Sequence, residues 1–314
     1  MSRTQVVNTV VAALVVALGS CGLAAQTAPA AGATAKMVVT EQARQGSTEA
    51  QIPAQDVNVY QGHERDQVTR WVPASGENAG LELYILFDDD SVASMLATQW
   101  GDFRHFIMEQ PESTKIGIAY MRNGSARVVQ ALTADHQLAA KALRLPLSAG
   151  GINGSPYFAL DDLVKHWPAT QDRREVLMIS DGVDRYYESA DIFDPYLEKA
   201  VKDAQRAGVV VNVIYTPGVG TFYRSNWHTL WGQTYLTQTA KETGGASYYI
   251  GFTAPAVAFA PFLDDLTRRL NHQYLLSFVA GPEKRAGLEP VRVNTTESNT
   301  ELIAAAKVFV PENR

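Results

Sequence analysis

Short apolar runs alternate with segments of helical periodicity through the middle of the chain. The runs at 83–87, 175–179 and 209–215 are rich in Val, Ile, Leu and Tyr. Runs of this length are typical of strands buried on both faces. Between them, apolar residues recur every three or four positions, for example at Trp100, Phe103, Phe106 and Ile107, as on the buried face of a helix. This alternation predicts an α/β fold with a doubly wound, mostly parallel sheet flanked by helices, over residues 81–272.

The segments at both ends of the folded part carry strand patterns. Within each of these segments, no helical pattern separates one strand from the next. Segments 57–60 and 67–72 flank a turn-prone stretch, and segments 274–279, 291–293 and 308–310 are rich in Val, Leu and Phe. We therefore expect an N-terminal β hairpin over residues 54–80 and C-terminal β strands over residues 273–314. The two groups should pair into one small β unit.

The N-terminal segment has the pattern of an export signal. Arg3 provides a basic start, and an unbroken apolar core at 10–18 precedes small residues, which is typical of a signal peptide over residues 1–25. Two outcomes stay open: cleavage near Ala25, or a lipobox at 18–21 that leaves a lipid anchor on Cys21. Either one predicts an exported protein that is periplasmic, at the cell surface or secreted. Residues 26–53 are rich in Ala, Thr, Gln and Gly, and we interpret them as a disordered linker.

The composition limits the classes of molecule that the chain is expected to bind. The chain of 314 residues carries a net charge of −6 without a basic cluster, so a nucleic-acid partner is not expected. Beyond the N-terminal signal, no apolar segment has the length of a transmembrane span. Cys21 is the single cysteine, so the folded part has no disulfide bond.

Carboxylates follow two of the predicted strands directly. Asp88, Asp89 and Asp90 end the first run, and Asp181 follows the second. Carboxyl ends of parallel strands meet at one edge of the sheet, where ligands of α/β proteins collect. Three adjacent carboxylates repel one another, so a cation or a set of hydrogen-bond donors must offset them. A simpler interpretation is an acidic turn in which Asp90 or Ser91 only caps a helix.

Several motifs occur in the order of a known family. They are FDDDSVAS (87–94), GGINGS (150–155), VLMISDG (176–182), AQRAGVVVNVIYTPGVG (204–220) and AKETGGASYY (240–249). This set resembles the von Willebrand factor A domain, most closely that of exported acidobacterial proteins, over about residues 80–272. The resemblance implies a non-catalytic interaction or adhesion module with a metal-ion-dependent adhesion site. Such a site would hold Mg²⁺, or Mn²⁺ or Ca²⁺, which captures an acidic residue of a protein ligand.

The resemblance also implies a degenerate set of metal ligands. Asp181 matches the Asp of the last motif, and Asp88 is favoured as the first ligand because the apolar run ends there. Asp90 then stands where the family has Ser, and Ser91 is the hydroxyl of another register. Ser155 can replace the Thr of the second loop, although an alternative alignment puts Ile152 there, which cannot bind a metal. The expected ligands are Asp88, Asp90, Ser91, Ser155 and Asp181.

The segment 217–233 is predicted to be a long loop after a strand end. It carries aromatic side chains at Tyr223, Trp227, His228 and Trp231, which suit a partner-binding rim. The other interpretation is a packed lid. The rim supports an alternative function, in which the metal site has decayed and this loop binds the partner.

Parts of the sequence resemble the motifs of two enzyme classes, and neither class is favoured. FDDDSV also fits the nucleophile motif of haloacid-dehalogenase-like, Mg²⁺-dependent phosphatases, with Asp88 as nucleophile and Asp90 as general acid. No later strand ends in the paired acids that such a site needs. A serine hydrolase is weaker still, because the sequence has no Gly-x-Ser-x-Gly elbow, and Ser155 is followed by Pro156. The six His residues are scattered without metal-ligand spacing. We therefore expect a non-enzyme.

Overall fold

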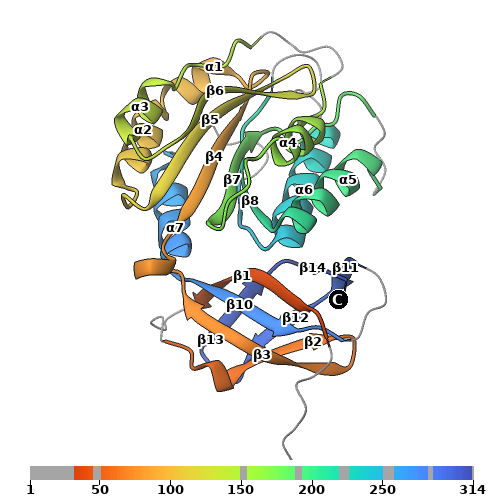
Figure 1. The fold of residues 1–314 in the computed structure, drawn as a ribbon. Coiled ribbons are helices and arrows are strands. Elements are labelled where there is room, and N and C mark those ends of the chain that lie inside the picture. The colour runs from red at the N-terminus through yellow and green to blue at the C-terminus, as the bar shows by residue number, and fades with distance from the viewer. Residues whose placement is uncertain are drawn as a thin grey trace, which may run out of the picture. The chain divides into compact units, whose positions relative to one another are not determined.

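A six-stranded sheet with the order β6-β5-β4-β7-β8-β9 forms the centre of the α/β part of the computed structural model (Figure 1). Strand β4 (Leu81–Asp88) is parallel to its neighbours β5 and β7, and only β6 is antiparallel, at one edge. All eight residues of β4 are buried, because both faces of the sheet are covered. The doubly wound, mostly parallel fold is confirmed. The other strands are β5 (Thr114–Arg122), β6 (Ser125–Thr133), β7 (Arg173–Ser180), β8 (Val209–Tyr215) and β9 (Ser247–Tyr248).

Helices cover the two faces of this sheet. One face packs against α2 (Trp100–Glu109), α3 (His136–Lys141) and α7 (Ala260–Asn271). The other face packs against α4 (Pro156–Lys165), α5 (Pro195–Ala207) and α6 (Asn226–Thr243), as Figure 1 also shows. A short helix, α1 (Ala93–Ala97), follows the acidic turn after β4. The apolar stripe predicted for α2 is buried, so its helical periodicity was interpreted correctly.

The structure describes residues 32–44, 51–148, 154–187, 193–218, 226–249, 258–281 and 286–312. The predicted signal peptide over residues 1–25, with its lipobox Cys21, lies outside these ranges, and so does Tyr223. None of the helices in the described ranges is long and apolar enough to cross a membrane.

The predicted β unit is present and joins both ends of the described chain. Its main sheet has the order β12-β2-β3-β10-β1-β13. The hairpin strands β2 and β3 pair with β12 and β10, respectively, as expected. The last strand instead pairs with β11 in a separate two-stranded sheet. The strands are β1 (Thr34–Ala43), β2 (Val57–Gln61), β3 (Glu64–Pro73), β10 (Gln273–Val279), β11 (Gly287–Pro290), β12 (Arg292–Thr295), β13 (Thr300–Ala304) and β14 (Lys307–Val310).

The disordered linker predicted over residues 26–53 is wrong for the segment that forms β1. This strand lies between β10 and β13. Ala35, Met37 and Val39 alternate along it and are at most 9% exposed. The alternation has the period of a strand, but it covers only these three apolar positions. Pairing with strands from the far end of the chain therefore orders a segment that looks featureless by composition.

The loop predicted over residues 217–233 is also partly wrong, because α6 begins at Asn226. Trp227, Trp231 and Tyr235 are four residues apart and pack in sequence, with ring centroids 5.6 and 5.8 Å apart. Spacing of four places side chains on one face of a helix. The aromatic residues thus follow a helical period that the polar residues between them obscured.

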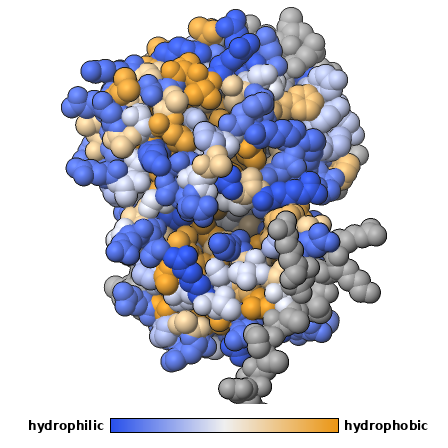
Figure 2. Space-filling view, in the orientation of Figure 1, coloured by the Kyte–Doolittle hydropathy of each residue, from blue (hydrophilic) through white to orange (hydrophobic). Residues whose placement is uncertain are grey.

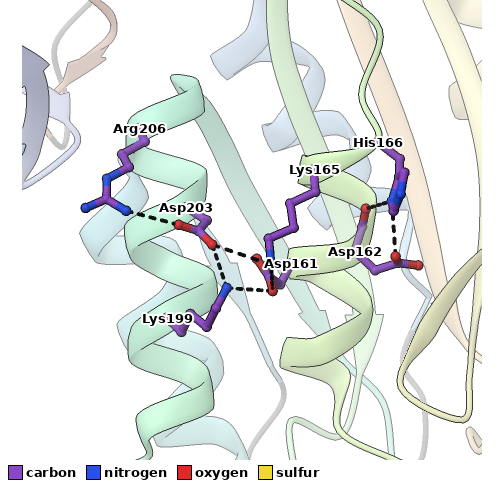
Figure 3. A network of polar contacts seen from close by, with 7 residues as sticks. All are labelled: Asp161, Asp162, Lys165, His166, Lys199, Asp203 and Arg206. Carbon is purple, nitrogen blue, oxygen red and sulfur yellow. Dashed lines mark hydrogen bonds and ion pairs between the residues drawn. The ribbon is translucent and has the colours of Figure 1, made fainter. Parts of the chain in front are cut away.

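A charged surface network joins α4 to α5 (Figure 3). The carboxylate of Asp161 accepts hydrogen bonds from Lys165 at 2.7 Å and Lys199 at 2.8 Å, and Lys199 also donates to Asp203 at 2.7 Å. On the face drawn in Figure 2, hydrophilic residues predominate over these helices. Such exposed pairs align neighbouring helices but contribute modestly to stability.

Candidate functional site

The carboxyl ends of β4 and β7 lie side by side, and their polar groups meet there. Phe87 is aligned with Ile179 in the parallel register, so the next residues are Asp88 and Ser180. The hydroxyl of Ser180 donates to Asp88 Oδ2 at 2.7 Å, and the backbone N–H of Asp90 donates to Asp88 Oδ1 at 2.9 Å. Both carboxylate oxygens of Asp88 therefore have protein donors, and the side chain is buried with 6% exposure.

Asp181 forms a buried ion pair with Arg185, a residue that the sequence reasoning missed. The guanidinium donates to both carboxylate oxygens of Asp181, and both residues are at most 7% exposed. The carboxylate also accepts the N–H of Val183 at 3.0 Å, and the N–H of Arg185 donates to Gly154 O at 3.2 Å. A signal existed in the sequence, because the loop reads Asp181-Gly-Val-Asp-Arg185 with opposite charges four residues apart.

The charges of this cluster are coupled. Burial raises the pKa of Asp88 to about 7, with the charge of Asp181 as the next cause, while Arg185 and the two hydrogen bonds act in the opposite direction. Burial also acts to lower the pKa of Arg185, but the charges of Asp181, Asp88 and Asp90 more than offset it, so its pKa is raised. Arg185 therefore stays protonated and is the positive charge beside these three carboxylates.

The segment after β8 covers the ion pair. A Cβ atom on Gly218 would lie 2.1 Å from Asp181 Oδ2 and 2.5 Å from Arg185 Nη2. The same segment is attached to the turn after β4, since Val92 N donates to Pro217 O at 3.0 Å and Ser91 forms a β-bridge with Gly218. Only glycine allows the backbone to approach the pair this closely.

The middle acid of the triplet, Asp89, pairs with Arg144 and not with Arg185. It accepts two hydrogen bonds from the guanidinium of Arg144, at 2.6 and 2.8 Å. Arg144 lies over the ring of Tyr120 at 3.7 Å from its centroid. This bidentate pair is the strong form of an ion pair and anchors the segment 144–148 to the strand end. The position of Asp89 is thus explained by its structural role, without a ligand.

Of the five expected metal ligands, three are brought together and two are not shown to join them. Asp88, Asp90 and Asp181 all interact electrostatically with Arg185. The hydroxyl of Ser155 instead donates to Asp184 Oδ2 at 2.7 Å. Ser91 is 1% exposed, and its hydroxyl has no hydrogen-bond partner among the described residues. Residues 150–153, which include the alternative position Ile152, lie outside the described ranges.

This arrangement fits a divalent cation poorly. An octahedral Mg²⁺ site needs oxygen ligands and room for waters. Here the oxygens of Asp181 are bonded to Arg185, those of Asp88 to Ser180 and Asp90, and Gly218 closes the space above. Within the described ranges no three His, Cys, Asp or Glu side chains are grouped as metal ligands. Metal binding stays a prediction, and the described donors argue against it.

The expected aromatic rim lies on the first turns of α6. Trp227 is 53% exposed, Leu230 is 43% exposed, and His228 and Trp231 are half-buried. Trp231 packs between Trp227 and Tyr235 and contacts the core on this face of the sheet. This part of α6 therefore combines an exposed tip with a packed base, and its role in binding a partner stays a prediction.

Backbone contact fixes this helix start against the acid cluster. A Cβ atom on Gly232 would lie 2.1 Å from Asp181 O, and one on Gly182 would lie 2.4 Å from Gly232 O. Gly182 has φ +71°, a conformation that favours glycine. The aromatic side chains of α6 and the Asp181–Arg185 pair are therefore two parts of one rigid edge.

No protein-family model and no curated protein matches the chain. Among solved structures, BatB from Bacteroides thetaiotaomicron is 14% identical, covers 61% of this chain and 97% of its own, and has a TM-score of 0.44. An aerotolerance-related membrane protein from Bacteroides fragilis is 18% identical, with 61% and 99% coverage and a TM-score of 0.43. A von Willebrand factor type A structure from Catenulispora acidiphila is 11% identical, with 92% and 76% coverage and a TM-score of 0.41. Similarity at this level assigns no function, and the α/β fold follows from the strand order of this chain itself.

Proposed function

We propose that this chain is an exported, non-catalytic interaction module that binds a protein partner through the aromatic start of α6. One observation carries the proposal: Trp227 is 53% exposed and packs edge-to-face against Trp231 at the carboxyl edge of the sheet. Exposed Trp side chains supported by packed neighbours are typical of the residues that dominate binding energy at protein interfaces. The von Willebrand A resemblance supports the same class of function through the motifs quoted above.

The rigidity of this edge supports the proposal further. Gly232 and Gly182 hold α6 in backbone contact with the loop after β7. A partner would therefore bind a preformed surface, which lowers the entropy that association costs. Tyr186, in the loop after β7, is 54% exposed and packs on Phe158 with ring centroids 5.2 Å apart. Tyr186 is therefore a second exposed aromatic side chain with a packed neighbour, in another loop of the same edge.

A second candidate is the metal-dependent adhesion site, with Mg²⁺ held by Asp88, Asp90, Ser91, Ser155 and Asp181. The convergence of Asp88, Asp90 and Asp181 on one positive charge favours it. It requires Arg185 to leave Asp181 before a cation binds. The phosphatase alternative is weaker, because Asp88 is 6% exposed and both of its oxygens already accept hydrogen bonds.

A random peptide library selected on the full chain would separate these candidates. Binding of the selected peptides is then measured in EDTA and in Mg²⁺, on the wild type, on Trp227→Ala and on Phe309→Ala. Phe309 is an exposed aromatic residue of β14, at 37% exposure, and is the matched control. We expect Trp227→Ala to weaken binding about 30-fold, with no change in Phe309→Ala and no dependence on Mg²⁺.

The opposite pattern would support the adhesion site. Peptides that bind only in Mg²⁺, that carry an essential acidic residue and that are indifferent to Trp227→Ala would reject the aromatic surface as the binding site. Asp181→Asn should then abolish their binding.

A further inference from the structure

We propose that the guanidinium of Arg185 takes the place of a divalent cation at the strand ends, so that the chain itself supplies the positive charge of this site, which becomes a divalent-cation site only when Arg185 is removed. The inference concerns the acid cluster and does not rest on the proposed partner. It follows from three features of the described residues: where the guanidinium lies, what covers it, and which oxygen donors its removal would release.

The position of the guanidinium is the first feature. It donates to both oxygens of Asp181, and it is attracted by Asp88 and Asp90 from the end of the neighbouring strand. The three carboxylates come from two loops that are 91 residues apart between Asp90 and Asp181. A single positive group that serves acids from both loops has the electrostatic role of a shared metal ion. Arg suits this role when buried because its planar fork binds carboxylates bidentately and cannot be deprotonated.

The cover over the pair is the second feature. Gly218 approaches so closely that a methyl group there would overlap Asp181 and Arg185. The chain on either side is held by the Pro217–Val92 hydrogen bond of 3.0 Å and by the bridge to Ser91. A hydrated cation cannot be added above the guanidinium without displacing this segment. The site in the wild type is therefore closed as well as occupied by the guanidinium.

The released donors are the third feature. Without the guanidinium, Asp181 would keep only the N–H of Val183 as a hydrogen-bond donor in the described structure. Asp88 and Asp90 would lose the positive charge of Arg185. The buried hydroxyl of Ser91, in the same turn, already has no partner. These are hard oxygen donors of the type that Mg²⁺ and Mn²⁺ select, and the space vacated by the guanidinium would admit an ion with water.

The test compares the full-length wild type with Arg185→Met and with the double variant Asp181→Asn/Arg185→Met. Met keeps most of the apolar volume of the Arg stem, and the double variant removes the ion pair without leaving an unpaired acid at position 181. Mn²⁺ binding is followed by electron paramagnetic resonance of the free ion, and Tm is measured with EDTA and with about 10 mM Mg²⁺.

We expect Mn²⁺ binding and a rise in Tm of at least about 4 °C in Mg²⁺ for Arg185→Met alone. The wild type and the double variant should bind no Mn²⁺ and show equal Tm values in both buffers. If Arg185→Met folds only in Mg²⁺, the result supports the proposal in the same way. Mn²⁺ binding by the wild type would overturn it, because the guanidinium would then not occupy the site.

A second result would also overturn the proposal. If Arg185→Met binds no Mn²⁺, or is equally unfolded in EDTA and Mg²⁺ while the double variant folds, the acids do not form a cation site and Arg185 only balances Asp181. Failure of the aromatic-surface proposal would leave all of these measurements unaffected, since none of them involves a partner.

Discussion

The hydroxyl of Ser180 donates a hydrogen bond of 2.7 Å to the carboxylate of Asp88, which joins the ends of two adjacent parallel strands. The same hydroxyl oxygen accepts the N–H of Gly182 at 3.1 Å. Ser180 is fully buried, so neither Asp88 nor Gly182 can use water in its place. This one side chain therefore sets both the carboxylate of β4 and the backbone turn after β7.

Ser180→Ala should destabilise the protein by about 1–3 kcal/mol, because it leaves a buried acceptor and a buried N–H without their partner. The free energy of unfolding from urea titration is the measurement. Thr234→Ala is the matched control, since that hydroxyl lies on an exposed residue and donates to Leu230 O at 2.8 Å; its effect should stay within about 0.5 kcal/mol. Equal effects of the two variants would contradict the bridging role of Ser180.

Gly218→Ala should cost at least about 2 kcal/mol, because the added methyl group overlaps the buried ion pair and forces backbone movement. The clash is with Asp181 Oδ2 at 2.1 Å and Arg185 Nη2 at 2.5 Å. Gly101→Ala in α2 is the control, because nothing lies within 4 Å of its added Cβ. That variant should stabilise by about 0.5–1 kcal/mol through helix propensity. The thermal stability of both variants is measured. If Gly218→Ala unfolds at the same temperature as the wild type, the close approach of Gly218 to the ion pair is refuted.

Asp66→Asn should make stability less dependent on pH. Burial, and next the charge of Glu64, raise the pKa of Asp66 from its ordinary value of 3.8 to about 6, and its Oδ2 has no hydrogen-bond partner in the described structure. An acid with a raised pKa contributes stability below about pH 4, and this is lost as the pH rises to about 6. The variant should be more stable than the wild type at pH 7 by up to about 1 kcal/mol, given the partial exposure of the group.

The measurement for Asp66 is a series of urea titrations between pH 4 and pH 7. Glu64→Gln should reduce the same slope partially, because Glu64 is the smaller of the two causes. Parallel pH profiles for the wild type and Asp66→Asn would show that Asp66 does not titrate in this range.

Asp161→Asn should destabilise by about 0.5–1 kcal/mol, with less effect in 1 M NaCl, because it removes the shared partner of two lysines. Burial raises the pKa of Asp161, but hydrogen bonds from Lys165 and Lys199 outweigh it, so the net pKa is lowered. Its stabilisation is therefore present above the unfolded pKa near 3.8 and is lost as the pH falls through the folded pKa. Urea titration at pH 7, at low and high salt, measures the effect.

Glu198→Gln is the control for Asp161, since Glu198 forms a single pair of 2.6 Å with Lys202 and both side chains are at least 40% exposed. It should cost no more than about 0.5 kcal/mol. If Asp161→Asn is also that small and is insensitive to salt, the network drawn in Figure 3 does not couple α4 to α5.

Local pattern predicted most of the α/β fold and the position of the acid cluster. The run that ends at Asp88 and the run that ends before Asp181 are both buried parallel strands. A short segment that is apolar on both faces is fully buried when it forms a central strand of such a sheet. Adjacent parallel strands then carry their terminal side chains to one edge, so the convergence of Asp88 and Asp181 on Arg185 follows from topology.

The local sequence pattern was insufficient to predict segments whose secondary structure depends on contacts with other parts of the chain. The sequence predicts a linker for strand β1 because its apolar alternation is short, whereas its order comes from pairing with β10 and β13. The start of α6 was interpreted as a loop because its aromatic period is visible only once Trp227, Trp231 and Tyr235 are aligned on one face.

The sequence by itself determined which side chains reach the carboxyl edge of the sheet, since strand position and direction follow from the spacing of apolar residues. Only the tertiary structure decided what neutralises those acids. Asp89 could pair with Arg144 and Asp181 with Arg185 only after loops were folded against them. The physical reason is that an ion pair depends on distances below about 4 Å, whereas apolar periodicity fixes position only to the level of an element.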